Sequence, residues 1–247
     1  MSASTGCFPE LSLVESIERL IDLEYSAVTI TIDEKTNQLK PSDVVADLEK
    51  AIALCRDTHR LNIGGYILGI DATGEEFYRQ FEACCKLAKA TKVVSITIPS
   101  AELGTPFNEE VEHLRRLVSI ATLEGVLVSI HSQLGRLSQD PDTVMVLCDN
   151  VKGLGVTLDP SHYIGGPYAA RGYDQIIKYV YQVLLRDSTK SKLQVRVGQG
   201  EVEYSKLITQ LGRLKYNRAL TIDIIEESDV EHASELRKMR LLLESLL

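Results

Sequence analysis

The stretch Gly153–Gly166, which reads GLGVTLDPSHYIGG, contains the pattern from which the fold of this chain can be inferred. Its apolar run, Leu154–Leu158, is only five residues long and is followed directly by Asp159 and Pro160. A short apolar run bounded by turn-forming residues is typical of a strand buried in a parallel sheet. The polar residues that follow it therefore mark the carboxyl end of such a strand.

Seven further runs of this kind occur along the chain, and segments with helical periodicity separate them. They are Ala3–Thr5, Ala27–Ile32, Leu61–Ile70, Lys92–Ile98, Val126–Ile130, Tyr181–Leu185 and Ala219–Ile225. Regular alternation of strand and helix indicates parallel βαβ units. Eight such units in 247 residues match the usual size of one α/β barrel. The sequence therefore predicts a single (β/α)8 TIM-barrel domain over residues 1–247.

Several helix starts are marked by residues that can accept hydrogen bonds from the first turn. Three pairs have the spacing of a capping box: Ser12 with Glu15, Thr73 with Glu76, and Ser228 with Glu231. Asp140 precedes Pro141, which combines an N-cap acceptor with a residue suited to the first helical position. The apolar face of the last segment, Asp229–Leu247, predicts a helix that closes the barrel.

Composition narrows the classes of function. The net charge of −8 disfavours a nucleic-acid partner. No apolar run approaches the length needed to cross a membrane, and the N-terminus lacks the features of a signal peptide, so we expect a cytoplasmic protein without a membrane partner. The five cysteines form no CxxC pair and are expected to be buried free thiols. Tryptophan is absent, so aliphatic side chains should supply most of the core.

The candidate functional residues are the polar ones that close the predicted strands, because barrel enzymes place their active sites at the carboxyl ends of the strands. His131 follows VLVSI, Asp159 and His162 follow LGVTL, Arg186 and Asp187 follow the seventh run, and Asp223 lies within the eighth. Since these strand ends lie on one face of a barrel, we expect the side chains to converge on one pocket. The other histidines, His59, His113 and His232, are predicted to lie exposed on helices.

In these segments the chain resembles the xylose isomerase-like sugar isomerases and epimerases, a family of TIM barrels. The resemblance rests first on GLGVTLDPSHYIGG, where Asp159 and His162 stand three residues apart, and then on EGVLVSI, VLLRDS, VGQGEVEY and ALTIDIIEES in the same order. It covers nearly the whole chain. The resemblance implies an isomerase or epimerase that moves a proton on the carbon next to a sugar carbonyl.

The resemblance also implies one divalent metal, held by Glu, Asp, His and Glu at the ends of strands five to eight. At these positions this chain has His131, Asp159, Leu184 and Asp223, so only the aspartate is unchanged. His131, Asp159 and Asp223 are candidate ligands for Mn, Co, Zn or Mg. A site without metal is the alternative. Asp223 and His131 are the candidate catalytic acid and base.

Other interpretations of the same residues remain open. His162 contacts a substrate hydroxyl or ties down its loop. Arg186 and Asp187 bind substrate, or form structural ion pairs with each other or with neighbouring strands. Asp223 lies in an apolar strand and needs a metal, an arginine or a substrate as its partner. Three further stretches are less specific. The backbone amides of GQGE, residues 198–201, could bind a phosphate. Tyr163, Tyr168 and Tyr173 form a pocket wall or pack their loop, and Gly64 and Gly65 indicate a strand bend, since they match no dinucleotide motif.

Two functions are consistent with these observations. The first is a sugar or sugar phosphate isomerase or epimerase acting on a small polyhydroxylated substrate. The second is a non-catalytic or carbohydrate-binding relative with a degenerate metal site, which Leu184 favours. The endonuclease branch of the superfamily requires many metal ligands and is disfavoured by five histidines and the acidic charge. A homo-oligomer is compatible with either function.

Overall fold

The computed structural model describes all residues, 1–247, and forms a closed barrel of eight parallel strands in chain order, β1 to β8. The strands are β1 (Ser2–Ser4), β2 (Ala27–Asp33), β3 (Asn62–Gly69), β4 (Ser95–Pro99), β5 (Leu127–His131), β6 (Leu154–Leu158), β7 (Val180–Leu185) and β8 (Leu220–Ile222). Pairing of Ser2 with Thr221 closes the ring. Each strand overlaps one of the predicted runs, which confirms the (β/α)8 barrel.

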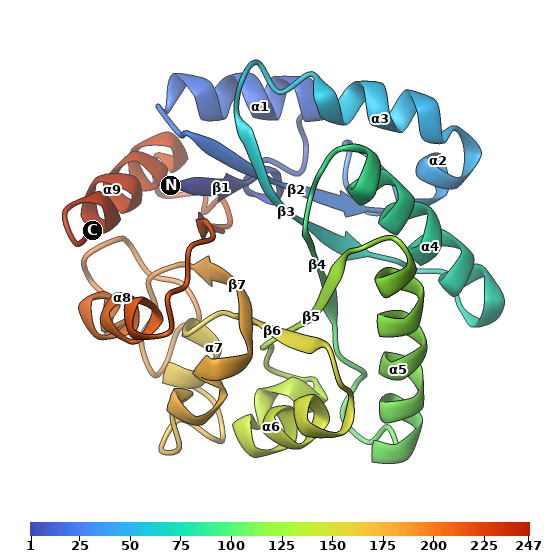
Figure 1. Ribbon diagram of the computed structural model, residues 1–247. Helices are drawn as coiled ribbons and strands as arrows, with labels where there is room; N and C mark the ends of the chain where they lie inside the picture. The colour runs from blue at the N-terminus through green and yellow to red at the C-terminus, as the bar shows by residue number, and fades with distance from the viewer.

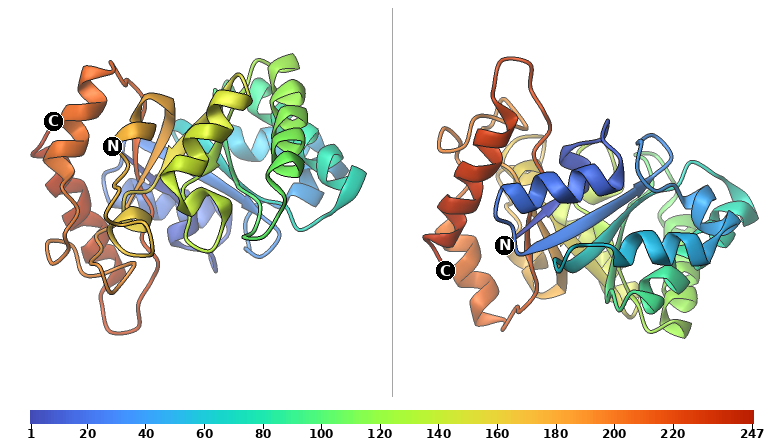
Figure 2. Two further views of the ribbon diagram at one scale, coloured as in Figure 1. Left: turned by 90° about the horizontal axis from the view of Figure 1, so that it is seen from below. Right: turned by 90° about the horizontal axis from the view of Figure 1, so that it is seen from above.

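The helices surround the ring of strands (Figure 1) and run alongside it on the outside (Figure 2). They are α1 (Leu13–Asp22), α2 (Pro41–Ala46), α3 (Leu48–Arg56), α4 (Gly74–Ala90), α5 (Phe107–Leu123), α6 (Pro141–Asn150), α7 (Ser161–Ile164), α8 (Tyr204–Arg213) and α9 (His232–Glu244). Short 3-10 turns lie at η1 (Thr5–Cys7), η2 (Leu137–Gln139) and η3 (Asp174–Tyr179). No helix is long and apolar enough to span a membrane.

Two of the four predicted helix caps are formed in the structure. Ser12 and Glu15 form the complete capping box of α1, and the Asp140 side chain caps α6. Thr73 precedes α4 without a side-chain cap bond. The prediction for Ser228 is wrong: a turn closed by the Val230 N–H and the Glu227 carbonyl ends before α9 begins.

The apolar core lies between the strands and the helices, as the aliphatic composition predicts. All five cysteines are buried and free. The prediction that three histidines are exposed holds only for His59, which lies in a turn. His113 is half-buried on α5, where Nδ1 lies 2.9 Å from the Tyr78 hydroxyl. His232 is buried, and its Nε2 lies within hydrogen-bond distance, 2.8 Å, of the carbonyl oxygen of Cys7.

The inside of the barrel is polar, a feature that the aliphatic composition does not predict. Thr157 on β6 hydrogen-bonds through its hydroxyl to Thr97 on β4 (2.7 Å) and Ser129 on β5 (2.6 Å). The Thr97 hydroxyl also donates to Gln182 Oε1 (2.9 Å). These buried hydroxyls satisfy one another, so the layer beneath the strand ends is a hydrogen-bonded network and not an apolar layer.

Glycines on β3 make room for this layer. A Cβ at Gly65 would lie 2.7 Å from Gln182 Oε1, so the Gln182 side chain crosses the barrel and ends against the β3 backbone. The neighbouring Gly64 is skipped where β2 pairs with β3, since Val28 pairs with Ile63 and Thr29 with Gly65. The two glycines, for which the sequence predicts a strand bend, thus lie where the β2–β3 register shifts by one residue.

Candidate active site

The strand ends bring five of the predicted residues to one face of the barrel. His131 is the last residue of β5, Asp159 directly follows β6, and His162 lies one turn later in α7. Arg186 follows β7, and Asp223 follows Ile222 at the end of β8. The side chains of Asp159, His162 and Arg186 are buried, whereas those of His131 and Asp223 are 15% and 22% exposed.

Asp159 is the centre of the cluster. Its Oδ1 accepts hydrogen bonds from the backbone and hydroxyl of Ser161, and its own N–H donates to Ser132 Oγ (2.8 Å). Its Oδ2 faces Arg186 Nη2 at 3.2 Å, His162 Nε2 at 3.5 Å and His131 Nε2 at 3.7 Å. Burial alone would raise the pKa of this carboxyl, but Arg186 and the two imidazoles outweigh it, so the pKa lies well below its usual range and Asp159 is ionised.

Arg186 bridges two carboxylates. The same Nη2 that faces Asp159 lies 2.9 Å from Asp223 Oδ2, to which it donates a hydrogen bond. Burial alone would lower the pKa of the guanidinium, but the carboxylates of Asp159 and Asp223 hold that pKa above its ordinary value. The ion pair expected by the structural interpretation of Arg186 is therefore present, and Asp223 has the cationic partner that its apolar strand requires.

His162 is neutral, with its proton on Nε2. Its Nδ1 accepts a hydrogen bond from the Leu134 N–H (3.2 Å), so the ring proton must be on Nε2, facing Asp159. Burial lowers the pKa of His162 to about 4, which keeps the ring uncharged at neutral pH. His162 thus ties down the loop after β5 and still presents one N–H to the cluster. The His131 ring lies edge-on to it, with the centroids 5.5 Å apart.

Leu184 lies where the resemblance would place a histidine ligand. Side chains alternate in a strand, so Gln182, Leu184 and Arg186 lie on the same face of β7. Gln182 points into the barrel, and Leu184 is buried there apart from the main apolar cluster. An aliphatic side chain at this position provides no ligand atom.

His131, Asp159 and His162 form a group whose ligand atoms lie within 4.8 Å of one another, a spacing that could hold a metal ion. Asp223, the third predicted ligand, is not in this group. Two features of the donor set do not fit a divalent ion: Arg186 already faces Asp159 Oδ2, and the His162 proton occupies its ligand nitrogen.

Several buried polar atoms of the cluster have no hydrogen-bond partner in the protein. They are His131 Nε2, Asp159 Oδ2 and Arg186 Nε, together with Ser188 Oγ two residues beyond Arg186. Buried polar atoms are normally paired, because leaving them unpaired costs about 1–3 kcal/mol each. Such a concentration of unsatisfied groups at a barrel mouth is typical of a site that receives a polar ligand.

Asp187 points away from this cluster and holds the loop of residues 188–203. Its Oδ2 accepts hydrogen bonds from the backbone N–H groups of Gly198 (2.8 Å) and Gly200 (2.9 Å), and its Oδ1 accepts one from Ser188 (3.1 Å). The N–H of Gln199 donates to Arg196 and that of Glu201 to Ser188. All four amides of GQGE are thus used within the protein, so the phosphate interpretation of this stretch is wrong.

Replacing Asp187 with alanine should destabilise the protein by about 1.5–3 kcal/mol, because three backbone N–H groups lose a charged acceptor. Hydrogen exchange at Gly198 and Gly200 should accelerate, as followed by mass spectrometry of peptides from the loop. Asp174→Ala, which removes an exposed partner of Lys206, is the control and should leave these amides protected. Unchanged exchange in Asp187→Ala would contradict this role for the carboxylate.

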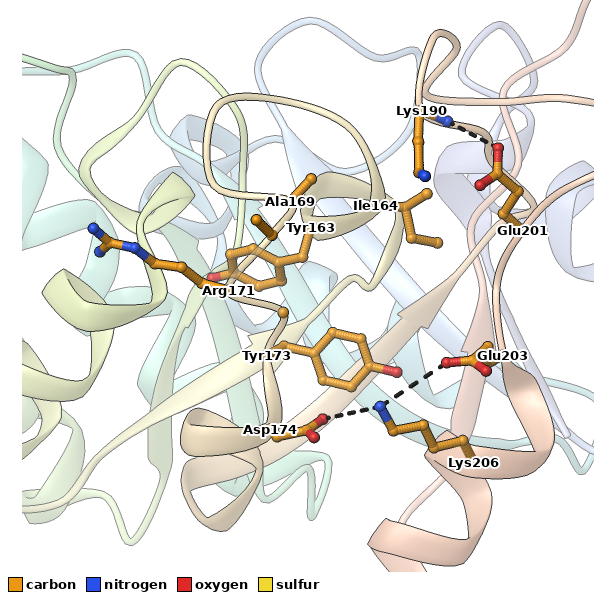
Figure 3. A pocket seen from close by; sticks show the side chains of 12 residues that line it. Tyr163, Ile164, Ala169, Arg171, Tyr173, Asp174, Lys190, Glu201, Glu203 and Lys206 are labelled. Carbon is orange, nitrogen blue, oxygen red and sulfur yellow. Dashed lines mark hydrogen bonds and ion pairs between the residues drawn. The ribbon is translucent and has the colours of Figure 1, made fainter.

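A cavity of about 370 Å³ lies between the loops that follow β6 and β7 (Figure 3). It is lined by Tyr163, Ile164, residues 169–174, Lys190, Glu201, Glu203 and Lys206. Lys206 pairs there with Asp174 (3.6 Å) and Glu203 (3.9 Å). Tyr163 both forms part of the pocket wall and packs its loop: its ring lines the cavity, and its hydroxyl donates a hydrogen bond to the Ser138 carbonyl. Lys206 is not among the predicted site residues because it lies on a helix, α8, and not at a strand end.

Solved structures show which proteins share this fold. A xylose isomerase domain protein from Planctomyces limnophilus superimposes with a TM-score of 0.78 at 17% identity, covering 100% of this chain and 95% of that one. The 3-keto-D-glucoside 4-epimerase from E. coli superimposes with a TM-score of 0.75 at 15% identity, covering 99% of this chain and 98% of that one. A xylose isomerase-like TIM barrel protein from Mycobacterium smegmatis, in complex with magnesium, superimposes with a TM-score of 0.75 at 13% identity. The match covers 100% of this chain and 97% of that one.

Sequence comparison gives the family. Among curated proteins none matches this sequence. The pattern of one family, described as Xylose isomerase-like TIM barrel, matches residues 17–245 and so includes every strand except the first and every residue of the cluster. The chain therefore belongs to the Xylose isomerase-like TIM barrel family.

Proposed function

We propose that the barrel mouth binds a small polyhydroxylated carbonyl compound, a sugar or sugar derivative, and catalyses its isomerisation or epimerisation. The observation that carries this proposal is the group of buried, unpartnered polar atoms on His131, Asp159 and Arg186. Hydroxyl and carbonyl oxygens of a sugar would satisfy such atoms, because they both donate and accept hydrogen bonds. The 3-keto-D-glucoside 4-epimerase among the structural neighbours supports the same substrate class.

The residues divide into distinct roles. His131 is the general base that removes the proton from the carbon next to the carbonyl, since its Nε2 has no partner and its side chain is partly exposed. The electron pair moves to the carbonyl oxygen and forms an enediolate. Asp223, partly exposed at the end of β8, is the second acid–base group. The Nε2–H of His162 donates to a substrate hydroxyl.

Solvent exchange tests this proposal directly. The protein is incubated in D₂O with a panel of aldoses and ketoses, free and phosphorylated, and NMR follows deuterium at the carbon next to the carbonyl. We expect incorporation into at least one sugar, because the enediolate must take its proton back from a group in contact with water. No incorporation across the panel would count against an isomerase or epimerase.

Two substitutions favour a second function, a carbohydrate-binding relative without catalysis. Leucine stands at position 184 in place of a histidine ligand, and histidine stands at position 131 in place of a carboxylate. Calorimetric titration with the same sugars separates the two. Binding with no deuterium incorporation would favour the binding protein.

The setting in which the protein works is also a proposal. The five buried free thiols support a reducing compartment, the cytoplasm, as the place of action. The net charge of −8 supports a small molecule over nucleic acid as the partner.

A further inference from the structure

We propose that the Arg186 guanidinium is the fixed cation of this site and takes the place of a divalent metal ion. The electrostatic part of this inference rests on geometry alone. Its catalytic part, stabilisation of the enediolate, rests on the proposed function.

The first argument is position. One nitrogen, Arg186 Nη2, lies 3.2 Å from Asp159 Oδ2 and 2.9 Å from Asp223 Oδ2, so a single positive charge lies between both carboxylates of the cluster. A metal bound to Asp159 Oδ2 would lie about 2.0–2.2 Å from that oxygen. Since the same oxygen contacts Nη2, the ion would be held within a few ångströms of a buried guanidinium. Like charges this close in a buried site repel strongly.

The second argument is the state of the donors. His162 Nδ1 accepts the Leu134 N–H, so freeing Nε2 for a metal would bring a proton on Nδ1 against that amide. Asp223 Oδ2 already accepts a hydrogen bond from Arg186. Within the group of His131, Asp159 and His162, only His131 Nε2 and Asp159 Oδ2 lack a hydrogen-bond partner, which is fewer than the three or four protein ligands that a bound metal usually has.

The third argument is that Arg186 is held rigidly and still has a free donor. Its side chain is 5% exposed, and its backbone carbonyl accepts a hydrogen bond from the Tyr204 hydroxyl (3.1 Å). Its Nε is buried without a hydrogen-bond partner. That N–H is available to the oxygen on which negative charge develops when the base removes the carbon-bound proton. A fixed donor aimed at a developing oxyanion stabilises it without reorganisation.

Metal binding tests the electrostatic part without any assay of activity. Wild type, Arg186→Gln and Arg186→Lys are purified without chelator, analysed for metal, and titrated with Co²⁺ while its visible absorption and the melting temperature are recorded. Wild type and Arg186→Lys, which keep a cation, should carry no metal and show no shift. Arg186→Gln should gain Co²⁺ absorption and a higher melting temperature with Co²⁺, because Asp159, Asp223 and His131 are freed.

A second substitution locates the gained site. Adding His131→Gln to Arg186→Gln should abolish the Co²⁺ absorption. Stoichiometric metal in wild type, or a folded Arg186→Gln protein that gains none, would overturn the inference. If Arg186→Gln does not fold, the wild-type and Arg186→Lys titrations still decide, since metal binding by either would refute it.

The catalytic part has its own readout. Deuterium exchange by wild type should be unaffected by EDTA and should fall by about 10²–10³-fold in Arg186→Gln, as for loss of an oxyanion donor. Exchange that EDTA abolishes would overturn the catalytic part. If no sugar exchanges at all, the proposed function fails while the metal titrations keep their meaning.

Discussion

Replacement of Arg186 with methionine is expected to lower the free energy of unfolding by about 3–5 kcal/mol at neutral pH. The change removes the one cation between Asp159, which is fully buried, and Asp223. Two carboxylates then face each other without compensation. Because domains of this kind are commonly stable by about 5–15 kcal/mol, the variant should still fold, and urea denaturation measures the loss.

A matched control exists on the surface. Arg171 also bridges two carboxylates, those of Asp140 and Asp142, but its side chain is 48% exposed. Arg171→Met should therefore cost less than about 1 kcal/mol. Equal losses in the two variants would show that burial of the Arg186 pair has no energetic consequence.

The loss in Arg186→Met should also depend on pH. In wild type the pKa of Asp159 lies below its unfolded value, so its contribution to stability is present above that unfolded value, about 3.9, and is lost as pH falls below it. Without Arg186 the carboxyl takes up a proton more easily. The gap between wild type and variant should thus be widest at neutral pH and shrink in acid.

The second large effect is expected for His131→Gln, which should slow deuterium exchange into the substrate by about 10²–10⁴-fold, as for loss of a general base. Glutamine fills a similar space and keeps a hydrogen-bonding group, but it cannot accept a proton at neutral pH. Because His131 Nε2 makes no hydrogen bond and lies 3.7 Å from the nearest carboxylate oxygen, that of Asp159, stability should change little. NMR measures the exchange, and thermal melting checks the fold.

His113→Gln is the matched control, since this histidine lies on α5 and is hydrogen-bonded to Tyr78, outside the cluster. It should exchange at the wild-type rate. If His131→Gln keeps full activity while Asp223→Asn loses it, the base is Asp223 and the roles given to the two residues are reversed.

The sequence predicts the barrel well because strand and helix alternate and each strand stops at a polar residue. The run Leu154–Leu158 is β6 without any change of bounds. Lys92 marks one limit: the predicted fourth run begins there, but the residue has a positive φ of 61° and lies in the turn before β4. Such short-range rules locate elements and leave their ends imprecise.

The candidate residues were found for a topological reason, whereas their pairing was not predictable. Parallel strands place His131, Asp159, Arg186 and Asp223 on one face whatever their side chains do. Which atoms meet depends on the register of neighbouring strands, such as Leu185 beside Ile222, and on how the ring closes. Asp187, one residue from Arg186, faces the other way into its loop, a difference that a strand-end rule cannot distinguish.

The contact between Gln182 and Gly65 has a consequence for how this barrel can diverge. Any side chain at position 65 would displace Gln182, and a shorter side chain at position 182 would leave the hydroxyl of Thr97 without its acceptor. A larger residue at 65 would require the end of Gln182 to move, and a shorter polar residue at 182 would make room for it. The two positions, on strands on opposite sides of the ring, are therefore coupled, and we expect changes at 65 to be accompanied by changes at 182 in homologous chains.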